Sequence, residues 1–336
     1  MMLFWLLTWT ALAGDHVVVH NGDTVESFAE SDADMATRIR ALNGLGPTEQ
    51  PAVGSLVELP DGLSGLPMEA AVVNVYRGAA AALPRSPQIN LVPGMGLPAG
   101  SRVCTSMDGY VTLRLAIDQE GLQHDDITLL PSTCLTIQAT SSRSSGRRSM
   151  VRLETGSITV PRPDAGASPG EITVATETGI TTADRGGFRV HVESDVARTE
   201  ALYNPLSVFG GGVEQRVEPG QGSRVRAGQA PSTPVALLSP GHPIRPLDGA
   251  TLRRPDFSWV RVDTALGYQF ELASSEDFRE MLVARSVDRP SWEPARLLLP
   301  GDVEGIWWRV SAIDRHGFTG VPSAPQRLAL PVGVSP

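Results

Sequence analysis

Residues 15–60 decide the fold of the first part of the chain: DHVVVHNGDTVESFAESDADMATRIRALNGLGPTEQPAVGSLVELP. A short apolar strand at 17–19 runs into an Asn-Gly-Asp-Thr corner at 21–24. Two short helical patterns follow, and a second short strand ends at Pro60. Strand, helix, helix and strand in so short a stretch predict a compact βααβ unit with a small core, which limits the stability of the unit by itself.

Capping residues and apolar spacing place both helices. Asp23 can cap the first helix, and Glu26 follows at capping-box spacing. Asp32 or Asp34 can start the second helix, and Asn43-Gly44 supplies the left-handed residue that ends it. The expected buried faces are made of apolar residues at helical spacing. They are Val25, Phe28 and Ala29 in the first helix, and Met35, Ile39 and Leu42 in the second.

This stretch resembles a LysM module, a small domain that grips the N-acetylated sugars of peptidoglycan or chitin. The resemblance implies a shallow groove between the loop before the first helix and the loop after the second. The glycan-binding residues that it implies are Gly22, Asp23, Thr24, Val25, Asn43, Gly44, Leu45, Ala52 and Val53. Backbone groups would pair with the N-acetyl amide, each contact contributing about 1 kcal/mol net. The alternative is a LysM-like fold without sugar affinity.

Composition limits the class of protein. The 336 residues suggest two or three domains, and 41% hydrophobic residues are enough to form buried cores. The 34 glycines and 27 prolines favour many short strands and turns. The net charge is −9, and all 28 basic residues are arginines. These arginines do not cluster into a basic stripe, so the sequence argues against a nucleic-acid partner.

The sequence begins like that of an exported protein. Residues 1–13, MMLFWLLTWTALA, resemble a secretory signal peptide with small residues at the cleavage site, which we place after Ala13. No later apolar run is long enough to span a bilayer, so we expect no membrane span in the mature chain. The expected location is the periplasm or the cell wall of a bacterium.

Cys104 and Cys134 are the only two cysteines. A cysteine pair in an exported protein predicts one disulfide, which would contribute roughly 3–4 kcal/mol in the chain-entropy model. Two buried free thiols are the alternative.

After a linker at 62–70, residues 71–229 read as a series of half-buried strands with alternating apolar and polar residues. The clearest strand patterns are at 111–115, 127–129, 135–137, 151–153 and 188–192, with turns at Gly109, Gly121, Gly156, Gly170 and Gly186-Gly187. The segment resembles a FecR domain. The motifs that carry the resemblance are Leu97-Pro98-Ala99-Gly100 before Val103-Cys104-Thr105, Leu153-Glu154-Thr155-Gly156-Ser157-Ile158, and Arg185-Gly186-Gly187-Phe188. The resemblance implies an all-β, solenoid-like roll.

A proline-rich linker at 230–246 precedes a last segment, 247–332, that resembles a fibronectin type III or immunoglobulin-like sandwich. Its strand patterns are Phe-Ser-Trp at 257–259, Tyr-Gln-Phe-Glu-Leu at 268–272 and Ile-Trp-Trp-Arg-Val at 306–310. Neighbouring residues in a strand point to opposite faces. We therefore expect Trp259 and one of Trp307 and Trp308 to fill the core.

No catalytic, metal or cofactor site emerges from the sequence. Gly166-Ala167-Ser168-Pro169-Gly170 matches the G-x-S-x-G elbow of hydrolases, but Pro169 lacks the N–H that the oxyanion hole requires. His124-Asp125-Asp126 is interpreted as a polar turn, and the six histidines are scattered.

Together these observations predict a mainly β, multidomain protein: a βααβ LysM-like module, a FecR-like β-solenoid or roll, and a C-terminal β-sandwich. The expected function is that of a non-enzymatic cell-envelope protein that binds peptidoglycan and acts as a scaffold or adaptor for an unidentified envelope protein. The alternative is a periplasmic sensor or accessory component of FecR-type envelope signalling. A wall hydrolase would need a catalytic set that the sequence does not supply.

Overall fold

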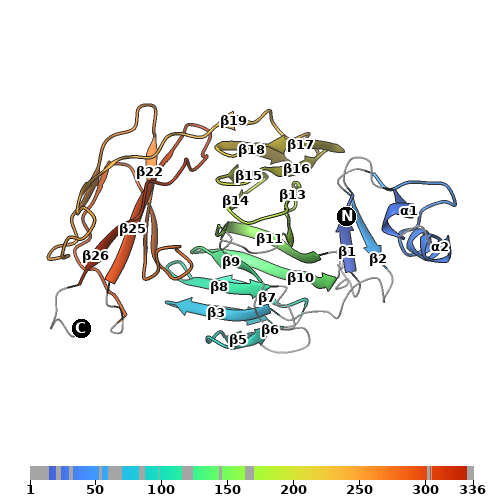
Figure 1. Cartoon of the computed structure of the whole chain (residues 1–336), viewed down its shortest axis with the longest axis horizontal. Coiled ribbons are helices and arrows are strands. Elements are labelled where there is room, and N and C mark those ends of the chain that lie inside the picture. The colour runs from blue at the N-terminus through green and yellow to red at the C-terminus, as the bar shows by residue number, and fades with distance from the viewer. Residues whose placement is uncertain are drawn as a thin grey trace, which may run out of the picture.

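The computed structural model describes residues 15–19, 24–29, 33–52, 55–59, 70–82, 88–97, 99–115, 124–143, 146–162, 170–300, 303 and 305–330. The chain is mainly β, as the sequence predicts, and three parts lie side by side (Figure 1). They are a small N-terminal module, a tall stack of strands and a C-terminal pair of sheets. The predicted signal peptide, most of the linker at 62–70 and residues 166–169 of the hydrolase-like motif lie outside the described residues.

The N-terminal module has the element order β1, α1, α2, β2. These elements are β1 (Asp15–Val18), α1 (Val25–Phe28), α2 (Ala33–Leu42) and β2 (Leu56–Leu59), with β1 and β2 antiparallel. Its core is made of Val19, Val25, Ala29, Ala36, Ile39 and Val57. Leu42 is 48% exposed, so its predicted place in the buried stripe was wrong. Leu42 is the last residue of α2, and Ala36, one turn before Ile39, occupies the buried face instead.

The central part, which we call the roll, consists of β3 to β19 in one continuous 17-stranded sheet. The strands are β3 (Ala70–Tyr76), β4 (Ala79–Ala82), β5 (Gln88–Asn90), β6 (Gly96–Leu97), β7 (Arg102–Thr105), β8 (Tyr110–Leu115), β9 (Asp125–Leu129), β10 (Cys134–Arg143), β11 (Gly146–Val160), β12 (Gly170–Ala175), β13 (Ile180–Ala183), β14 (Phe188–Glu193), β15 (Val196–Ala201), β16 (Leu206–Gly210), β17 (Val213–Val217), β18 (Gln221–Arg226) and β19 (Val235–Ala236). All the quoted strand patterns of this segment are confirmed.

The roll has two layers that share β11. One layer runs β6-β3-β8-β9-β11-β14-β15-β18-β19, and the other runs β5-β4-β7-β10-β11-β12-β13-β16-β17. Neighbours are antiparallel except β11 and β12. Apolar residues of both layers meet in one core, for example Leu113 and Ile158 from the first layer and Val103 and Val174 from the second.

Gly156 is the point at which β11 changes layer. The strand pairs with β10 up to Thr155 and with β14 from Gly156 onward. Gly156 has a φ of +88°, and a Cβ there would lie 2.6 Å from Thr133 Cα. The predicted turns at Gly156 and Gly170 were therefore wrong, because both residues lie within strands. Beside this corner, the direct cross-strand partners Cys104 and Cys134 form a disulfide.

The C-terminal part is a sandwich of two sheets. One sheet holds β20 (Pro243–Arg245), β21 (Phe257–Trp259) and β24 (Ser291–Trp292); the other holds β23 (Met281–Val287), β22 (Gly267–Ala273), β25 (Gly305–Ile313) and β26 (Gln326–Ala329). Trp259 and Trp308 lie in its core, at 2% and 0% exposure. The proline-rich segment 230–246 contains β19 and β20, so it contributes one strand to the roll and one to the sandwich.

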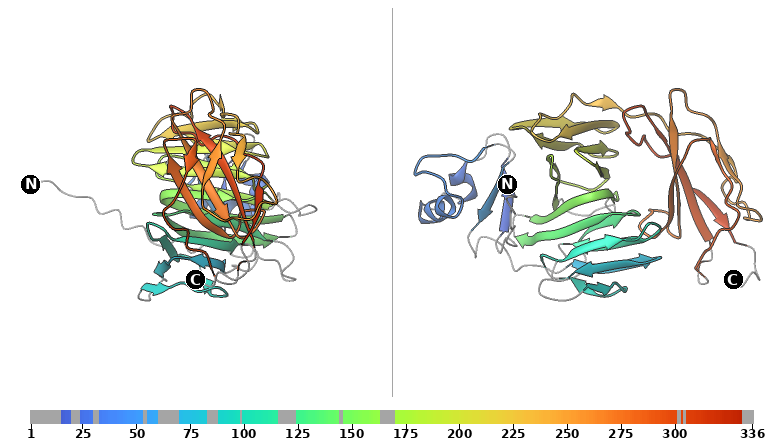
Figure 2. Two further views of the ribbon diagram at one scale, coloured as in Figure 1. Left: turned by 90° about the vertical axis from the view of Figure 1, so that its left-hand side faces the viewer. Right: turned by 180° about the vertical axis from the view of Figure 1, so that it is seen from behind.

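The sandwich lies along one side of the roll, as the right-hand view in Figure 2 shows. Tyr110 of the roll packs with Ala273, Phe278 and Met281 of the sandwich, and the half-buried Trp307 lies against this cluster. The Tyr110 hydroxyl also accepts a hydrogen bond from Ala284 N at 2.6 Å. Apolar and polar contacts thus join the roll and the sandwich directly.

Candidate functional site

The first predicted glycan-binding loop meets the segment that precedes β2. Val25 is fully buried, and its backbone N–H donates to Gln50 Oε1 at 2.8 Å. Its side chain therefore belongs to the core, while Thr24 beside it is half-buried at the surface. Gly22, Asp23 and Val53 lie outside the described residues.

Glu26 connects this loop to the second helix. Its carboxylate accepts hydrogen bonds from Arg40 and from Gln50 Nε2, the latter at 3.0 Å. The hydrogen bond from Arg40, followed by that from Gln50, lowers the pKa of Glu26 to about 2. The carboxylate is therefore ionised near neutral pH, and it joins α1 to Arg40 of α2 and to Gln50.

The second predicted loop is built by the end of α2. Leu45 N donates to Arg40 O at 2.9 Å and Gly44 N to Ala41 O at 3.4 Å, with Gly44 at a φ of +64°, which is the Schellman pattern. Asn43 donates to Ile39 O and to Glu58 O, and its Oδ1 accepts from Glu58 N. The Asn43 side chain therefore fastens α2 to β2.

The candidate residues divide into two groups. Val25, Asn43 and the half-buried Leu45 support the module from within. Thr24, Gly44 and Ala52 lie at its surface, although the Ala52 carbonyl accepts a hydrogen bond from Ser55 N. The helices lie on the side of β1 and β2 that faces away from the roll (Figure 1). Among the described residues, the roll and the sandwich therefore do not cover the helices.

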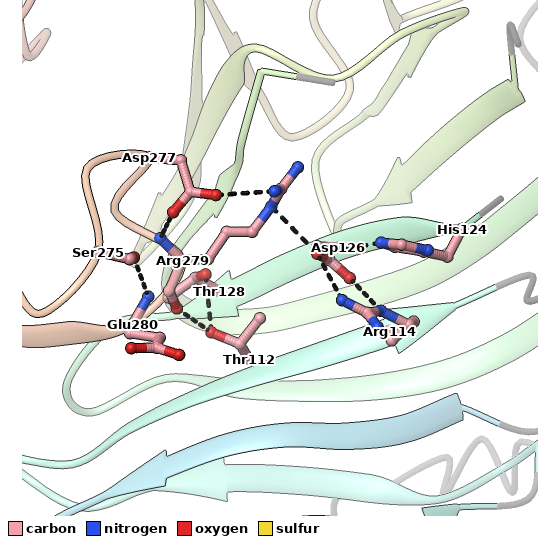
Figure 3. A network of polar contacts seen from close by, with 9 residues as sticks. All are labelled: Thr112, Arg114, His124, Asp126, Thr128, Ser275, Asp277, Arg279 and Glu280. Atoms are coloured by element: carbon pink, nitrogen blue, oxygen red, sulfur yellow. Dashed lines mark hydrogen bonds and ion pairs between the residues drawn. The ribbon is translucent and has the colours of Figure 1, made fainter. Parts of the chain in front are cut away.

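A charged cluster at the junction of roll and sandwich was not predicted (Figure 3). The Asp126 side chain is 2% exposed, and its oxygens lie 3.0 Å from Arg114 Nε and 3.2 Å from Arg279 Nε of the sandwich. His124 Nε2 lies 3.6 Å away. The interpretation of residues 124–126 as a polar turn was wrong, because β9 begins at Asp125. Next to the cluster, Thr112 Oγ1 donates to Arg279 O at 2.6 Å.

A second cluster crosses the same junction. Glu271 of the sandwich is fully buried between Arg309 of its own sheet and Arg189 of the roll, whose nitrogens lie 2.5 and 3.4 Å from Glu271 Oε2. Burial by itself raises the pKa of Glu271, but the positive charges of Arg309 and Arg189 outweigh it, so the pKa lies below its ordinary value. Glu271 is therefore a buried anion that joins the two parts.

Glu200 is a buried carboxyl at the same junction, where its Oε1 accepts a hydrogen bond from Thr319 N at 3.1 Å. Burial raises the pKa of Glu200 to about 7, although the charge of Arg189 acts in the opposite direction. Unlike Glu271, this side chain therefore gains or loses a proton near neutral pH.

Glu200 is expected to make stability depend on pH. The ordinary pKa of this carboxyl is 4.5, and in the folded chain it is about 7. Between these two pH values the folded chain keeps a proton that the unfolded chain has released. The free energy of unfolding should therefore fall as pH rises through this window, by on the order of 3 kcal/mol. Urea unfolding of the parent and of Glu200→Gln across this window measures the effect, because the glutamine removes it. If the free energy of unfolding changed with pH in the same way in both proteins, the raised pKa of Glu200 would be contradicted. Glu271, with its lowered pKa, acts only at lower pH.

Ser157 and His191 are direct cross-strand partners on the same layer, with Ser157 Oγ and His191 Nδ1 2.6 Å apart. Burial, and then the charge of Arg198, lower the pKa of His191, so the imidazole is neutral near neutral pH. Sequence reasoning could not find this pair, because residues 34 positions apart become neighbours only through the register of β11 and β14.

No family model matches the chain, and no curated protein matches it. Two crystal structures of a candidate anti-sigma factor from Parabacteroides distasonis are similar over 40% of this chain and 59% of theirs, with a TM-score of 0.31 and 10% and 9% identity. A likeness at this level carries no functional argument. No helix in the described part of the chain is long and apolar enough to cross a membrane.

Proposed function

We propose that this protein is a non-enzymatic cell-envelope scaffold that binds peptidoglycan through its N-terminal module. In this proposal the module is LysM-like and the roll is FecR-like. The roll and the sandwich together present a broad surface to an envelope protein. The protein acts outside the cytoplasm, after removal of the segment at 1–13.

The surface of the N-terminal module is the observation that carries the proposal. Contacts join the segments that carry the two candidate loops and so support the proposal: Leu45 N donates to Arg40 O, and the side chains of Arg40 and Gln50 both donate to Glu26. Thr24 is half-buried, Gly44 and Ala52 are exposed, and a Cβ added at Gly44 would meet no described atom within 4 Å. The open space at Gly44 suits close approach by an N-acetyl group.

Retention on purified sacculi tests the proposal. Thr24→Arg places a long charged side chain over the candidate groove, and we expect it to weaken retention of the full mature chain about tenfold, which corresponds to roughly 1.4 kcal/mol. Thr37→Arg is the matched control, because Thr37 is exposed on α2 and its hydroxyl donates to Ala33 O of its own helix. Equal retention of the two variants, or no retention of the parent, would refute the sugar-binding role.

A further inference from the structure

The turn that follows β25 reaches across the junction and lies on the polar face of the roll. We call this turn, residues 314–320, the latch. Three hydrogen bonds hold it, and each joins a charged side chain of the roll to the backbone of the latch. They run from Arg198 Nε to His316 O at 2.9 Å, from Thr319 N to Glu200 Oε1 at 3.1 Å and from Arg189 Nη1 to Gly320 O at 3.3 Å.

Phe318 anchors the latch by packing against the roll. The residue is 2% exposed, and it lies over Gly222 of β18. A Cβ added at Gly222 would lie 2.8 Å from Phe318 Cδ1 and 3.1 Å from Leu237 Cδ2. The ring therefore fills space that the absence of a side chain at position 222 leaves open.

The latch is also closed by bonds of its own. Asp314 Oδ1 accepts hydrogen bonds from His316 N at 2.8 Å and from Phe318 N at 2.9 Å. Asp314 N donates to Phe318 O at 3.1 Å, and Gly317 makes the turn with a φ of +79°. None of these bonds involves the roll, so the turn can separate from the roll as a unit.

Glu200 is the buried carboxyl beneath the latch, and its neighbouring arginines pair with other groups. Arg189 is its direct cross-strand partner, and Arg198 lies two residues earlier on β15, so the three side chains share one face. Arg189 pairs with Glu271, and Arg198 pairs with Glu193. In the described part of the chain Glu200, 2% exposed, has no ion-pair partner. Its ionised form is therefore costly while the latch covers it.

The other groups around Glu200 do not remove this cost. The titratable side chains that the packed elements bring near are His191 of β14, Glu271 of β22, and Asp314, Arg315 and His316 of the latch. His191 is neutral near neutral pH, and Arg315 Nε bonds to His316 Nε2. Burial, and to a lesser extent the charge of Asp314, raise the pKa of Glu200 to about 7 against the charges of Arg189 and Arg198.

We propose that the latch is a proton-controlled switch, which stays on the roll while Glu200 is protonated and releases as the pH rises toward neutrality. Release lets water reach the ionised carboxylate, and it uncovers the polar face of β14 and β15. The contacts of Tyr110 and Asp126 with the sandwich lie on β8 and β9, which β11 and β14 separate from β15. The sandwich therefore stays attached when the latch opens. The switch does not depend on sugar binding by the N-terminal module.

Hydrogen exchange of the Thr319 amide, followed by NMR on the full mature chain at pH 5 and pH 7.5, measures the opening of the latch. The rates are corrected for the intrinsic pH dependence of amide exchange. The Glu200 carboxyl has its ordinary pKa of 4.5 in the open latch and one of about 7 in the closed latch. Linkage then predicts an opening constant about fiftyfold larger at pH 7.5 than at pH 5.

Glu200→Gln should remove this rise, because the glutamine stays neutral and keeps an oxygen for Thr319 N. The matched Glu218→Gln should keep it, because the Glu218 side chain is 53% exposed. The Phe270 amide, in the core of the sandwich, is the reference for unfolding of the whole chain. A larger opening constant at Thr319 than at Phe270, with a rise that only Glu200→Gln removes, supports the switch.

Three results would each overturn the switch. Equal opening constants at Thr319 and Phe270 would mean that the latch opens only when the whole chain unfolds. A Thr319 opening constant that does not rise in the parent, or that rises equally in Glu200→Gln, would remove Glu200 from its control. The ¹³C shift of the Glu200 carboxyl in the parent gives a separate measurement, and a titration midpoint near the ordinary value of 4.5 would have the same consequence.

Discussion

Replacing Glu271 with alanine is expected to lower the free energy of unfolding by about 3–5 kcal/mol, because removal of one partner leaves the other charges buried and uncompensated. Arg309 and Arg189 both pair with Glu271, and Arg189 comes from the roll. Arg189 Nη1 also donates to Gly320 O of the sandwich, at 3.3 Å. The loss should therefore affect the docking of the two parts as well as the sandwich itself.

Urea unfolding of the full chain measures this loss, and Glu218→Ala provides the matched control. Glu218 also forms an ion pair, 2.7 Å from Arg216 Nε, but both side chains are more than half exposed. Exposed pairs contribute about 0–1 kcal/mol, so the control should change little. A Glu271→Ala loss as small as that of Glu218→Ala would show that the buried cluster does not hold the junction together.

Gly156→Ala is expected to destabilise the roll by about 2–5 kcal/mol, for two reasons that add. The positive φ by itself costs an alanine about 1–2 kcal/mol. The new Cβ would also lie 2.4 Å from Thr133 Oγ1 and 2.7 Å from Ser132 O, so backbone must move, and such overpacking costs a further 1–3 kcal/mol or so. The point at which β11 passes between the layers would therefore be distorted.

Gly212→Ala separates these two reasons. Gly212 also has a positive φ, +75°, but an added Cβ there would meet no described atom within 4 Å. We expect this control to lower the free energy of unfolding only by the backbone cost, about 1–2 kcal/mol. Thermal melting of both variants measures the difference, and equal losses would mean that the neighbours of Gly156 yield without cost.

Local patterns predicted much of the fold. Alternation identified β8, β9, β10, β11 and β14, and Asn43-Gly44 marked the end of α2. The expectation that Trp259 and one member of the Trp307-Trp308 pair fill the core is confirmed, and Trp308 is that member. These features depend on neighbours in the sequence, whose side chains alternate or recur with the geometry of the backbone itself. The site residues were harder to predict from the sequence, because Val25 and Asn43 support the module rather than face outward.

The sequence by itself determined which residues form strands and helices, and which face of each strand is apolar. Only the tertiary structure decided that the polar face of the β8, β9, β11 and β14 layer is covered, because alternation does not reveal what packs on the outer side of a sheet. That cover buries Asp126, Glu200 and Arg189 and brings Glu271 beside Arg189, 82 positions away along the chain. Such pairs arise where the surfaces of two parts of the chain meet, and no short stretch of sequence contains both partners.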